Sequence, residues 1–525
     1  MKRLLTIAFI FAFFHANSYC FEVDGINYKA LSSNTAQVIP ISSSGGGSSE
    51  ISIGINYGYS GDVVIPETIN YNGSTYQVVS AEDDVFASSA KMTSISLPSS
   101  LTELGPSPFA CCSKLMSITV DPNNPVYTSD NGVLYDKDKH TLIAVPGGLS
   151  GSFIVPTSVT AIANSAFYGC FRLTSISIPE SVSDIGANAF RACTSLTTVN
   201  LPEQITAIKY GTFHGCSTLK TISIPSGVEL IDDYAFYYCR NLQDLQLPSA
   251  LTQIGEYAFC TCNLLRTVTI PEGVKSIGQR AFESSKSLAK IALPSSLEEI
   301  GAGIFRGCTS LLSIDLSSSN THFIVEDGVL LDINKTTLIC CPGGRKGKYE
   351  LPSTVKVIEE YAFYNCKGLT SIVLPEGLTT IRTASFTYCS LLDKIILPST
   401  VKTIGKSAFV GCSGLQAFVS RSHTPPIITS EAFSTDTYSL PLYVVGTSVL
   451  LYQNADYWKN FGIMKLMGDV NQDGRISVVD VMILVNSITG NDSEAAPFEI
   501  TLGDINNDGQ LSVVDVMMLV ELIML

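Results

Sequence analysis

The chain has 525 residues, of which 45% are hydrophobic and 15% are charged, and its formal net charge is −15 with a pI near 4.8. This acidic balance argues against a nucleic-acid-binding protein, which would carry basic patches, and it leaves both protein and glycan partners open. The apolar content is sufficient for a large buried core.

The N-terminus has the pattern of a secretory signal peptide. Lys2 and Arg3 form a charged start, and the apolar run of residues 4–14 that follows is too short to span a bilayer stably. We therefore expect residues 1–20 to be a signal peptide, and the mature chain to be secreted or displayed on a bacterial cell surface without a transmembrane segment.

Two cleavage positions fit this signal peptide, one after Ser18 and one after Cys20. A lipoprotein would carry its lipid on Cys20, but Tyr19 is a poor fit to the small residue that precedes a lipidated cysteine. The sequence thus argues against a lipid anchor.

A 23-residue repeat runs through most of the chain. Phenylalanine, usually preceded by alanine, recurs at this interval before and after one longer gap, at Phe167, Phe190, Phe213, Phe236, Phe259, Phe282, Phe305, Phe363, Phe386 and Phe409. A fixed period of this length indicates a solenoid, in which units too small to bury their own apolar face share one continuous core. The spacing predicts about 14 or 15 coils.

Two longer units interrupt this period in the same way. The intervals from Phe109 to Phe167 and from Phe305 to Phe363 are both 58 residues, which is one coil plus an insert of 35 residues. Each insert contains Asn-Gly or Asp-Gly followed by alternating apolar residues, a pattern typical of a turn between strands. We interpret each insert as a β-hairpin and a further strand that continue the stack.

One coil shows how the repeat is expected to fold. Leu173, Ile176 and Ile178 have the spacing of a short parallel strand with its apolar side chains facing inward, and the proline that follows ends the strand. Gly186 permits a sharp corner. Phe190 then returns to the core in a short helical or irregular turn, where it is expected to be part of an aromatic spine.

Most of the fifteen cysteines share one repeat position, three residues after the phenylalanine. The nine are Cys170, Cys193, Cys216, Cys239, Cys262, Cys308, Cys366, Cys389 and Cys412. Ser285 takes this position in one coil, so the position requires a small side chain and not a disulfide. We expect a ladder of free thiols, although occasional bridging is geometrically possible. The cysteines also lack the paired spacing and the histidines of a zinc site.

This repeat resembles the BspA-like leucine-rich repeat family of secreted and surface proteins over roughly residues 21–466. Residues 21–28 resemble the mature start of such proteins, and residues 442–461, which include Trp458, resemble their C-terminal cap. A cap is also required physically, because a bare last coil would expose its core. The resemblance implies a leucine-rich-repeat solenoid of parallel β coils with short helical turns.

After the solenoid the pattern changes to two segments that share a metal-loop spacing, residues 469–480 and 504–515. Each reads Asp-x-Asn-x-Asp-Gly and has aspartate at its twelfth position. In such a loop the oxygens of positions 1, 3 and 5 converge on a cation, and the carboxylate of position 12 reaches it from the first turn of a helix. Residues 481–488 and 516–525 are apolar runs that would supply these helices.

Two departures make residues 468–525 resemble a type I dockerin: position 12 is aspartate where an EF-hand has glutamate, and no full helix precedes each loop. The resemblance implies a small all-α domain that binds two calcium ions. The implied first site consists of the side chains of Asp469, Asn471, Asp473 and Asp480 with the carbonyl of Arg475. The implied second site consists of the side chains of Asp504, Asn506, Asp508 and Asp515 with the carbonyl of Gln510.

Dockerins bind cohesin modules through helix residues near loop positions 10 and 11, which are Val478, Val479, Val513 and Val514 in this chain. Many cellulosomal dockerins carry polar residues at these positions, so the partner is expected to differ. The alternative is that the valines pack the two helices together. Because both segments carry the same residues, two binding modes related by a two-fold axis are possible.

The expected domain order combines both resemblances. It is a signal peptide at 1–20, an N-terminal β-rich cap at 21–86, BspA-like leucine-rich repeats at 87–433, a C-terminal cap at 434–466, and a dockerin-like domain at 467–525.

The sequence contains no catalytic motif of the common kinds: no Gly-x-Ser-x-Gly, no His-Glu-x-x-His and no phosphate-binding glycine loop. Glu298 and Glu299 are a formal candidate for a glycosidase pair, but they fall at variable positions of the coil that are expected to face solvent. We therefore expect a protein that is not an enzyme.

The leading hypothesis is a secreted or surface-exposed binding protein, whose solenoid face takes a protein or glycan ligand and whose dockerin attaches it to a cohesin-like partner in the presence of calcium. Membership of a BspA-like family links it to adhesion by analogy only. The alternative is a targeting or structural subunit of a glycan-degrading, cellulosome-like complex, and a third possibility is an unrecognised hydrolase. The sequence does not identify the ligand of the solenoid.

Overall fold

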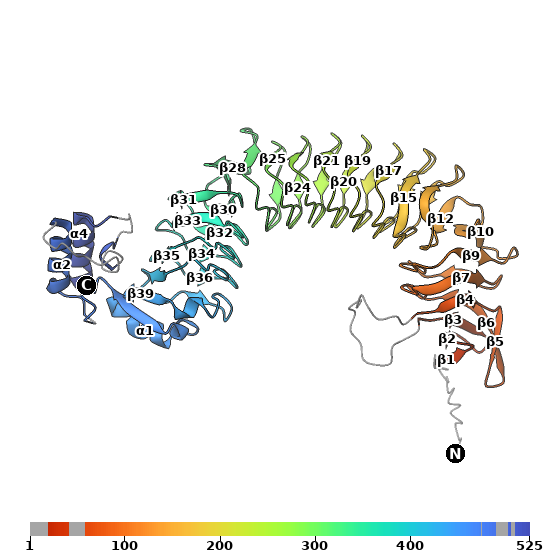
Figure 1. Cartoon of the computed structure of the whole chain (residues 1–525), viewed down its shortest axis with the longest axis horizontal. Helices are drawn as coiled ribbons and strands as arrows, with labels where there is room; N and C mark the ends of the chain where they lie inside the picture. Colours follow the sequence, from red (N-terminus) through yellow and green to blue (C-terminus); the bar gives the residue numbers. More distant parts are fainter. Residues whose placement is uncertain (1–18, 41–57, 474, 490–501, 506–509, 525) are drawn as a thin grey trace, which may run out of the picture. The chain divides into compact units, whose positions relative to one another are not determined.

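The computed structural model describes residues 19–40, 58–473, 475–489, 502–505 and 510–524. The chain divides into two compact units, Met1–Ile205 with Gly211–Leu219, and Thr206–Tyr210 with Lys220–Leu525. Within each unit the coils follow one another in chain order (Figure 1). The expected signal peptide lies outside the described residues, apart from Tyr19 and Cys20. Among the described residues, no helix combines the length and the apolar character needed to cross a membrane.

The coils of the first unit confirm the parallel strand predicted from the repeat. β15 (Arg172–Ser177) pairs in parallel with β17 (Thr198–Asn200), and Ser175 lies opposite Thr198, one repeat length away. Leu173 and Ile176 are buried in the core, as the alternation requires. Because parallel pairing recurs from coil to coil, these strands satisfy main-chain groups of their neighbours.

The corner after the second short strand depends on a close approach between successive coils. β16 (Asp184–Ile185) pairs in parallel with β14 (Ala161–Ile162) and leads directly into Gly186. A Cβ atom on Gly186 would lie 2.5 Å from the main-chain nitrogen of Asn164 in the preceding coil. The glycine is therefore required because the two backbones nearly touch.

A spine of phenylalanine rings fills the centre of the coils. Phe190 is fully buried, and its ring centroid lies 5.2 Å from that of Phe167 and 5.3 Å from that of Phe213. The segment around each phenylalanine is a run of turns. The residue two positions before the phenylalanine adopts a left-handed conformation, with φ of 58° at Ser165 and 56° at Asn188.

The predicted cysteine ladder is confirmed, and all fifteen cysteines are free. The Cys193 thiol donates a hydrogen bond of 3.2 Å to the carbonyl oxygen of Phe167 in the preceding coil. Ser285 makes the equivalent bond, 2.9 Å long, to the carbonyl oxygen of Phe259. Burial raises the pKa of the Cys193 thiol well above its usual value, so this side chain stays protonated and keeps its donor.

The two inserts form hairpins that continue the stack, as predicted. In the first insert, β10 (Tyr127–Asp130) and β11 (Val133–Asp136) form an antiparallel hairpin, and β12 (Thr141–Ala144) and β13 (Ser150–Ile154) pair in parallel with strands of the next coil. Each insert thus closes a further coil. For this reason the solenoid has about 17 turns between residues 80 and 467, more than the spacing of the phenylalanines predicted.

The described residues of the first unit form four sheets. One sheet has the order β1 (Cys20–Val23), β2 (Ile26–Ala30), β3 (Thr35–Val38), β6 (Ser74–Ala81), β5 (Thr68–Tyr71), with β8 (Glu103–Leu104) paired to β6. A second has the order β4 (Ser60–Val64), β7 (Lys91–Leu97), β9 (Ser117–Val120). The other two are β10-β11-β12-β14-β16 and β13-β15-β17.

The described residues of the second unit form six sheets. Their strands are β18 (Ala207–Ile208), β20 (Leu230–Ile231), β22 (Gln253–Ile254), β24 (Ser276–Ile277) and β26 (Glu299–Ile300); β19 (Thr221–Ser223) and β21 (Asp244–Gln246); β23 (Thr267–Thr269), β25 (Lys290–Leu293) and β27 (Ser313–Leu316); β28 (Phe323–Glu326), β29 (Val329–Asp332), β30 (Thr337–Cys340), β32 (Val357–Ile358), β34 (Thr380–Ile381), β36 (Thr403–Ile404) and β38 (Ile427–Ile428); β31 (Lys346–Glu350) and β33 (Gly368–Val373); β35 (Lys394–Leu397), β37 (Ala417–Ser420), β39 (Pro441–Val445) and β40 (Ile463–Met467).

Aromatic side chains seal the last coil of the second unit. Trp458 is almost fully buried, packs edge-on against Phe433, and donates a 2.7 Å hydrogen bond to the carbonyl of Pro426. The helices of this end and of the tail are η1 (Thr437–Ser439), η2 (Gly446–Ser448), α1 (Val449–Asn454), η3 (Trp458–Asn460), α2 (Val478–Thr489) and α4 (Val513–Met524). Trp458 therefore covers the core as expected from the sequence.

We predict that Cys193→Ser changes the free energy of unfolding by less than about 1 kcal/mol, because serine makes the same hydrogen bond at position 285. Phe190→Ala is expected to cost about 3–5 kcal/mol, since it leaves a cavity in the spine. Urea denaturation followed by circular dichroism measures both changes. An equally large loss of stability in the two variants would contradict our account of the ladder.

Candidate functional site

The predicted metal loops sit at the N-termini of the two tail helices, and each helix begins with a capping box. Ser477 precedes α2, and its hydroxyl oxygen accepts a 3.2 Å hydrogen bond from the Val479 main-chain nitrogen. In return, Oδ2 of Asp480 accepts a 2.8 Å hydrogen bond from the Ser477 main-chain nitrogen. This reciprocal pair satisfies two helix donors. The pattern Ser-x-x-Asp in the sequence is the signal for this cap, which gives Asp480 a role besides the predicted metal binding.

The first loop wraps around its own carboxylates. Asp480 is fully buried and Asp469 is 5% exposed. Oδ1 of Asp469 accepts a 3.0 Å hydrogen bond from the main-chain nitrogen of Asp473, and Oδ1 of Asp473 accepts a 2.9 Å bond from that of Arg475. Oδ1 of Asp480 accepts from the main-chain nitrogen of Asn471 at 3.2 Å. Four predicted side-chain ligands therefore lie within one closed loop.

The second loop is described only in part. Asp504 is 7% exposed and Asp515 is fully buried. Asp515 accepts hydrogen bonds from the main-chain nitrogens of Ile505, at 2.9 Å, and of Ser512, at 2.8 Å, which repeats the capping box of α2. Gln510 lies at the surface before α4. The predicted ligands Asn506 and Asp508 lie outside the described residues.

The chemistry of the first loop fits a hard cation. Its donors are all oxygens, two of its carboxylates are removed from solvent, and buried carboxylates are costly unless a positive charge or hydrogen bonds compensate them. Across the described residues, no group of three or more His, Cys, Asp or Glu side chains is arranged to hold a metal ion. The carboxylates of Asp473 and Asp480 accept amide hydrogen bonds instead. The donor set thus suits calcium, and the metal sites stay a prediction.

The tail helices have distinct inner and outer faces. α2 and α4 pack on each other, and Leu484 and Leu519 are almost fully buried between them and the last solenoid sheet. That apolar cluster also contains Tyr443 of β39 and Met467 of β40. The tail is therefore packed directly on the end of the solenoid within the second unit.

The four predicted partner-binding valines lie on the outer face. Val478 is 65% exposed, Val479 53%, Val513 65% and Val514 51%. These valines do not pack the two helices together, which was the alternative that the sequence left open. Four further exposed side chains were not predicted to lie on this outer face, namely Met482, Val485, Met517 and Val520. Their repeated spacing in the two helices was the available signal.

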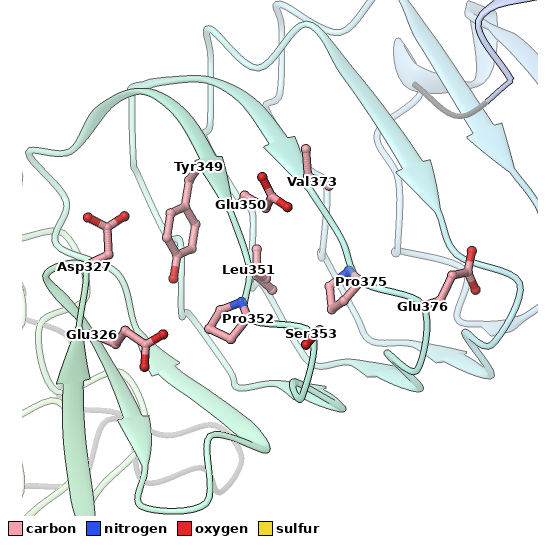
Figure 2. A pocket seen from close by; sticks show the side chains of 10 residues that line it. All are labelled: Glu326, Asp327, Tyr349, Glu350, Leu351, Pro352, Ser353, Val373, Pro375 and Glu376. Carbon is pink, nitrogen blue, oxygen red and sulfur yellow. The ribbon is translucent and has the colours of Figure 1, made fainter. Parts of the chain in front are cut away.

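A pocket of about 600 Å³ lies in the solenoid beside the second insert. Figure 2 shows Glu326 and Asp327 at one end of this pocket and Glu376 at the other. Arg345 forms an ion pair with Asp327, and its guanidinium lies 4.2 Å from the centroid of the Tyr349 ring. Lys335 pairs with Glu326. Two of the pocket carboxylates are thus paired with neighbouring cations.

The candidate acid pair predicted from the sequence faces solvent. Glu298 and Glu299 are exposed, and Glu298 forms a 3.3 Å ion pair with Lys275. His214 is half-buried in the first unit, and this burial, together with the charge of Arg191, lowers its pKa to about 4. It is therefore neutral at physiological pH.

The fold defines a leucine-rich-repeat solenoid with a small helical module at its C-terminus, and comparison with known families agrees. Residues 67–150, 149–264, 229–327 and 346–451 match the BspA type leucine rich repeat region, and residues 467–524 match the dockerin type I domain. The chain belongs to the BspA type leucine-rich repeat family and carries a C-terminal type I dockerin domain. The matches identify these two modules, and no curated protein is significantly similar to the chain.

Several solved structures of bacterial leucine-rich repeat proteins are similar to this chain. A leucine rich cell surface protein from Faecalibacterium prausnitzii is 21% identical, with 86% of this chain and 96% of that chain covered and a TM-score of 0.43. A leucine-rich repeat protein from Bacteroides ovatus is 26% identical, with 76% of this chain and 94% of that chain covered and a TM-score of 0.41.

We predict that replacing a side chain by alanine lowers the free energy of unfolding much more on the inner face of α4 than on its outer face. Leu519→Ala should cost about 2–5 kcal/mol, because it opens a cavity in the cluster beneath the helices. Val513→Ala should cost less than about 0.5 kcal/mol, because its side chain already faces solvent. Thermal unfolding followed by the helical circular-dichroism signal, which comes mainly from the tail, compares them. Equal losses would mean that Val513 is buried in solution.

Proposed function

We propose that this protein is a secreted or surface-displayed, non-catalytic binding protein. Its solenoid presents one extended side-chain surface to a protein or glycan ligand, and its dockerin attaches the molecule to a cohesin-bearing partner when calcium is bound. The observation that carries the proposal is the outer face of the dockerin, where both helices present the same exposed valines. These side chains gain nothing for the fold in their exposed positions, and such patches mark interaction sites.

The two loops are proposed to hold one calcium ion each. Asp469, Asn471, Asp473, Asp480 and the carbonyl of Arg475 would hold the first ion; Asp504, Asn506, Asp508, Asp515 and the carbonyl of Gln510 would hold the second. Calcium supplies the positive charge that carboxylates crowded into a small loop need in order to stay together. In the described loop, amide hydrogen bonds to Asp473 and Asp480 already hold part of this arrangement.

The partner surface is proposed to be apolar. Val478 and Val479 on α2 and Val513 and Val514 on α4 are equivalent residues on two equivalent helices, so a partner can bind in either of two orientations related by a two-fold axis. A cohesin that uses polar residues at these positions would leave them unpaired against valine, which costs affinity.

The cellular setting of the proposal is extracellular. The N-terminal sequence has the pattern of a signal peptide, and a dockerin acts where cohesin modules are displayed. A role as a subunit of a glycan-degrading complex is the second candidate, favoured by the dockerin itself. Cohesin-bearing scaffold proteins in the secretome of the source organism would favour this second role.

We predict that chelation of calcium removes most of the helical circular-dichroism signal of α2 and α4, since helices this short do not persist alone. Calcium should restore the signal and bind at two sites by calorimetry. Magnesium should substitute poorly, because it demands a tighter octahedron. Asp469→Ala with Asp473→Ala should abolish one site.

Asp456→Ala, which removes an exposed aspartate outside both loops, is the control and should leave both sites intact. A helical signal that chelator does not change, together with no heat on calcium addition, would show that these loops do not bind the ion.

We predict that Val478→Asp with Val479→Asp leaves cohesin binding nearly intact, because the partner can use α4 in the second orientation. Adding Val513→Asp and Val514→Asp should weaken binding at least about thirtyfold, or about 2 kcal/mol. Surface plasmon resonance with cohesin modules of the same organism measures this. Thr489→Asp, on an exposed part of α2, is the control. Complete loss from the first pair alone would exclude the two-orientation model.

A further inference from the structure

One corner of the coil carries small side chains in some coils and large side chains in others. The residue two positions before the spine phenylalanine is left-handed in coils of both units, with φ between 52° and 64°. In the first unit this corner holds small residues, namely Ser107, Ser165 and Asn188. In the second unit four coils hold large residues there, namely Tyr234, Tyr257, Arg280 and Tyr361. Three other coils of this unit hold Gly303, Ala384 and Ser407 at the same corner.

The fold does not require large residues at this corner. The first unit builds the same coil with serine and asparagine, and a left-handed conformation is less costly for asparagine than for a bulky residue. Four bulky residues at left-handed positions of one edge therefore carry an energetic cost that the coil itself does not explain. Such clustered strain is characteristic of functional surfaces.

These side chains form a continuous aromatic and cationic row, which we call the tyrosine belt: Tyr234, Tyr257, Arg280, Arg306, Tyr361 and Tyr364. Tyr234 stacks on Tyr257 with ring centroids 4.9 Å apart. The Arg280 guanidinium lies 5.5 Å from the Tyr257 centroid and 5.0 Å from that of Tyr361. Arg306 lies 4.7 Å from the Tyr361 centroid and 4.5 Å from that of Tyr364.

The way the rings are packed limits the ligands that the belt can take. The face of Tyr257 is covered by a second ring and by a guanidinium, and Tyr361 lies between two guanidinium groups. A sugar ring stacks on an open aromatic face, which Tyr257 and Tyr361 do not offer. What they present is partly exposed ring edges, phenol hydroxyls and guanidinium groups, a combination that dominates the energetics of protein–protein interfaces.

The arginine end of the belt is positively charged in an acidic chain, whereas the carboxylates of Glu256 and Asp233 lie near its Tyr234 end. Arg280 and Arg306 lie side by side in a chain of net charge −15. The single carboxylate of Glu283 pairs with both, at 2.8 Å from Arg306 and 3.8 Å from Arg280, so this cluster keeps a net positive charge. Arg240, stacked 4.8 Å from the centroid of Tyr238, adds a further positive charge in the coil of Tyr234. We propose that the tyrosine belt is the ligand-binding surface of the solenoid and that it binds an acidic segment of a partner protein. This inference rests on the proposed binding function and specifies its ligand.

The test uses the full chain with displayed random peptides as the probe. The belt variant combines Tyr234→Asn, Tyr257→Ser and Tyr361→Asn, which are residues that the first unit uses at the same corner. The control variant combines Met116→Ser and Ile154→Ser, two exposed apolar residues of the first unit outside the belt. Circular-dichroism melting checks that both variants fold. If the first belt variant does not fold, a second belt variant that combines Arg280→Asn with Arg306→Gln replaces it.

Peptides selected on the wild-type chain are expected to be rich in Asp and Glu, and to bind the belt variant at least about tenfold more weakly while binding the control equally. A higher salt concentration should weaken the binding of these peptides to the wild-type chain. The inference is overturned if no peptide is selected or if selected peptides bind the belt variant as well as wild type. It is also overturned if heparin-derived or neutral oligosaccharides, tested in parallel, are the ligands that need the belt.

These outcomes separate the inference from the proposed function. A peptide or glycan that binds the solenoid away from the belt leaves the binding role standing and removes the belt as its site. If neither the peptide screen nor the oligosaccharide screen yields a ligand of the solenoid, both the inference and the proposed binding role of the solenoid are wrong.

Discussion

The stacking of identical coils at a register of 23 residues is the constraint on which the rest of this structure depends. It brings Ser175 opposite Thr198 and brings the Cys193 thiol to the carbonyl of Phe167. It also leaves no room for a side chain at Gly186, because the backbone of the previous coil lies there. Positions that touch the next coil are therefore fixed in size, whereas positions that point away from it can change without cost to the fold.

This division explains how much of the fold could be predicted. The inward strand residues and the phenylalanine spine recur in every coil, so their period revealed them. The left-handed corner was not predictable, because the main chain imposes its conformation and the residue there varies from Ser165 to Tyr234. The number of turns was underestimated for a related reason: the inserts lack the spine phenylalanine, yet their strands β12 and β13 pair as a full coil.

In the dockerin, too, the features set by residue spacing could be predicted, whereas those set by tertiary packing could not. The oxygen-rich loops follow from residue spacing, and the structure brings Asp469 and Asp480 into one closed loop. The faces of α2 could not be assigned from sequence, because the helix has apolar residues on nearly all sides. Only packing on the last solenoid sheet decides that Leu484 is buried while Val478 is exposed. Asp480 has a second role as a helix cap, so its presence alone does not distinguish a metal ligand from a structural residue.

The two modules differ in whether their proposed binding surfaces are already ordered before a ligand or partner binds. The solenoid corner is held by main-chain hydrogen bonds between coils, so the side chains of the tyrosine belt are positioned in advance and lose little conformational entropy when a ligand binds. The dockerin face belongs to two short helices whose N-termini are closed by loops rich in carboxylates, and its order depends on what compensates those charges. Calcium would then control the attachment of the molecule without altering the ligand surface, because the charges that respond to it are confined to the tail.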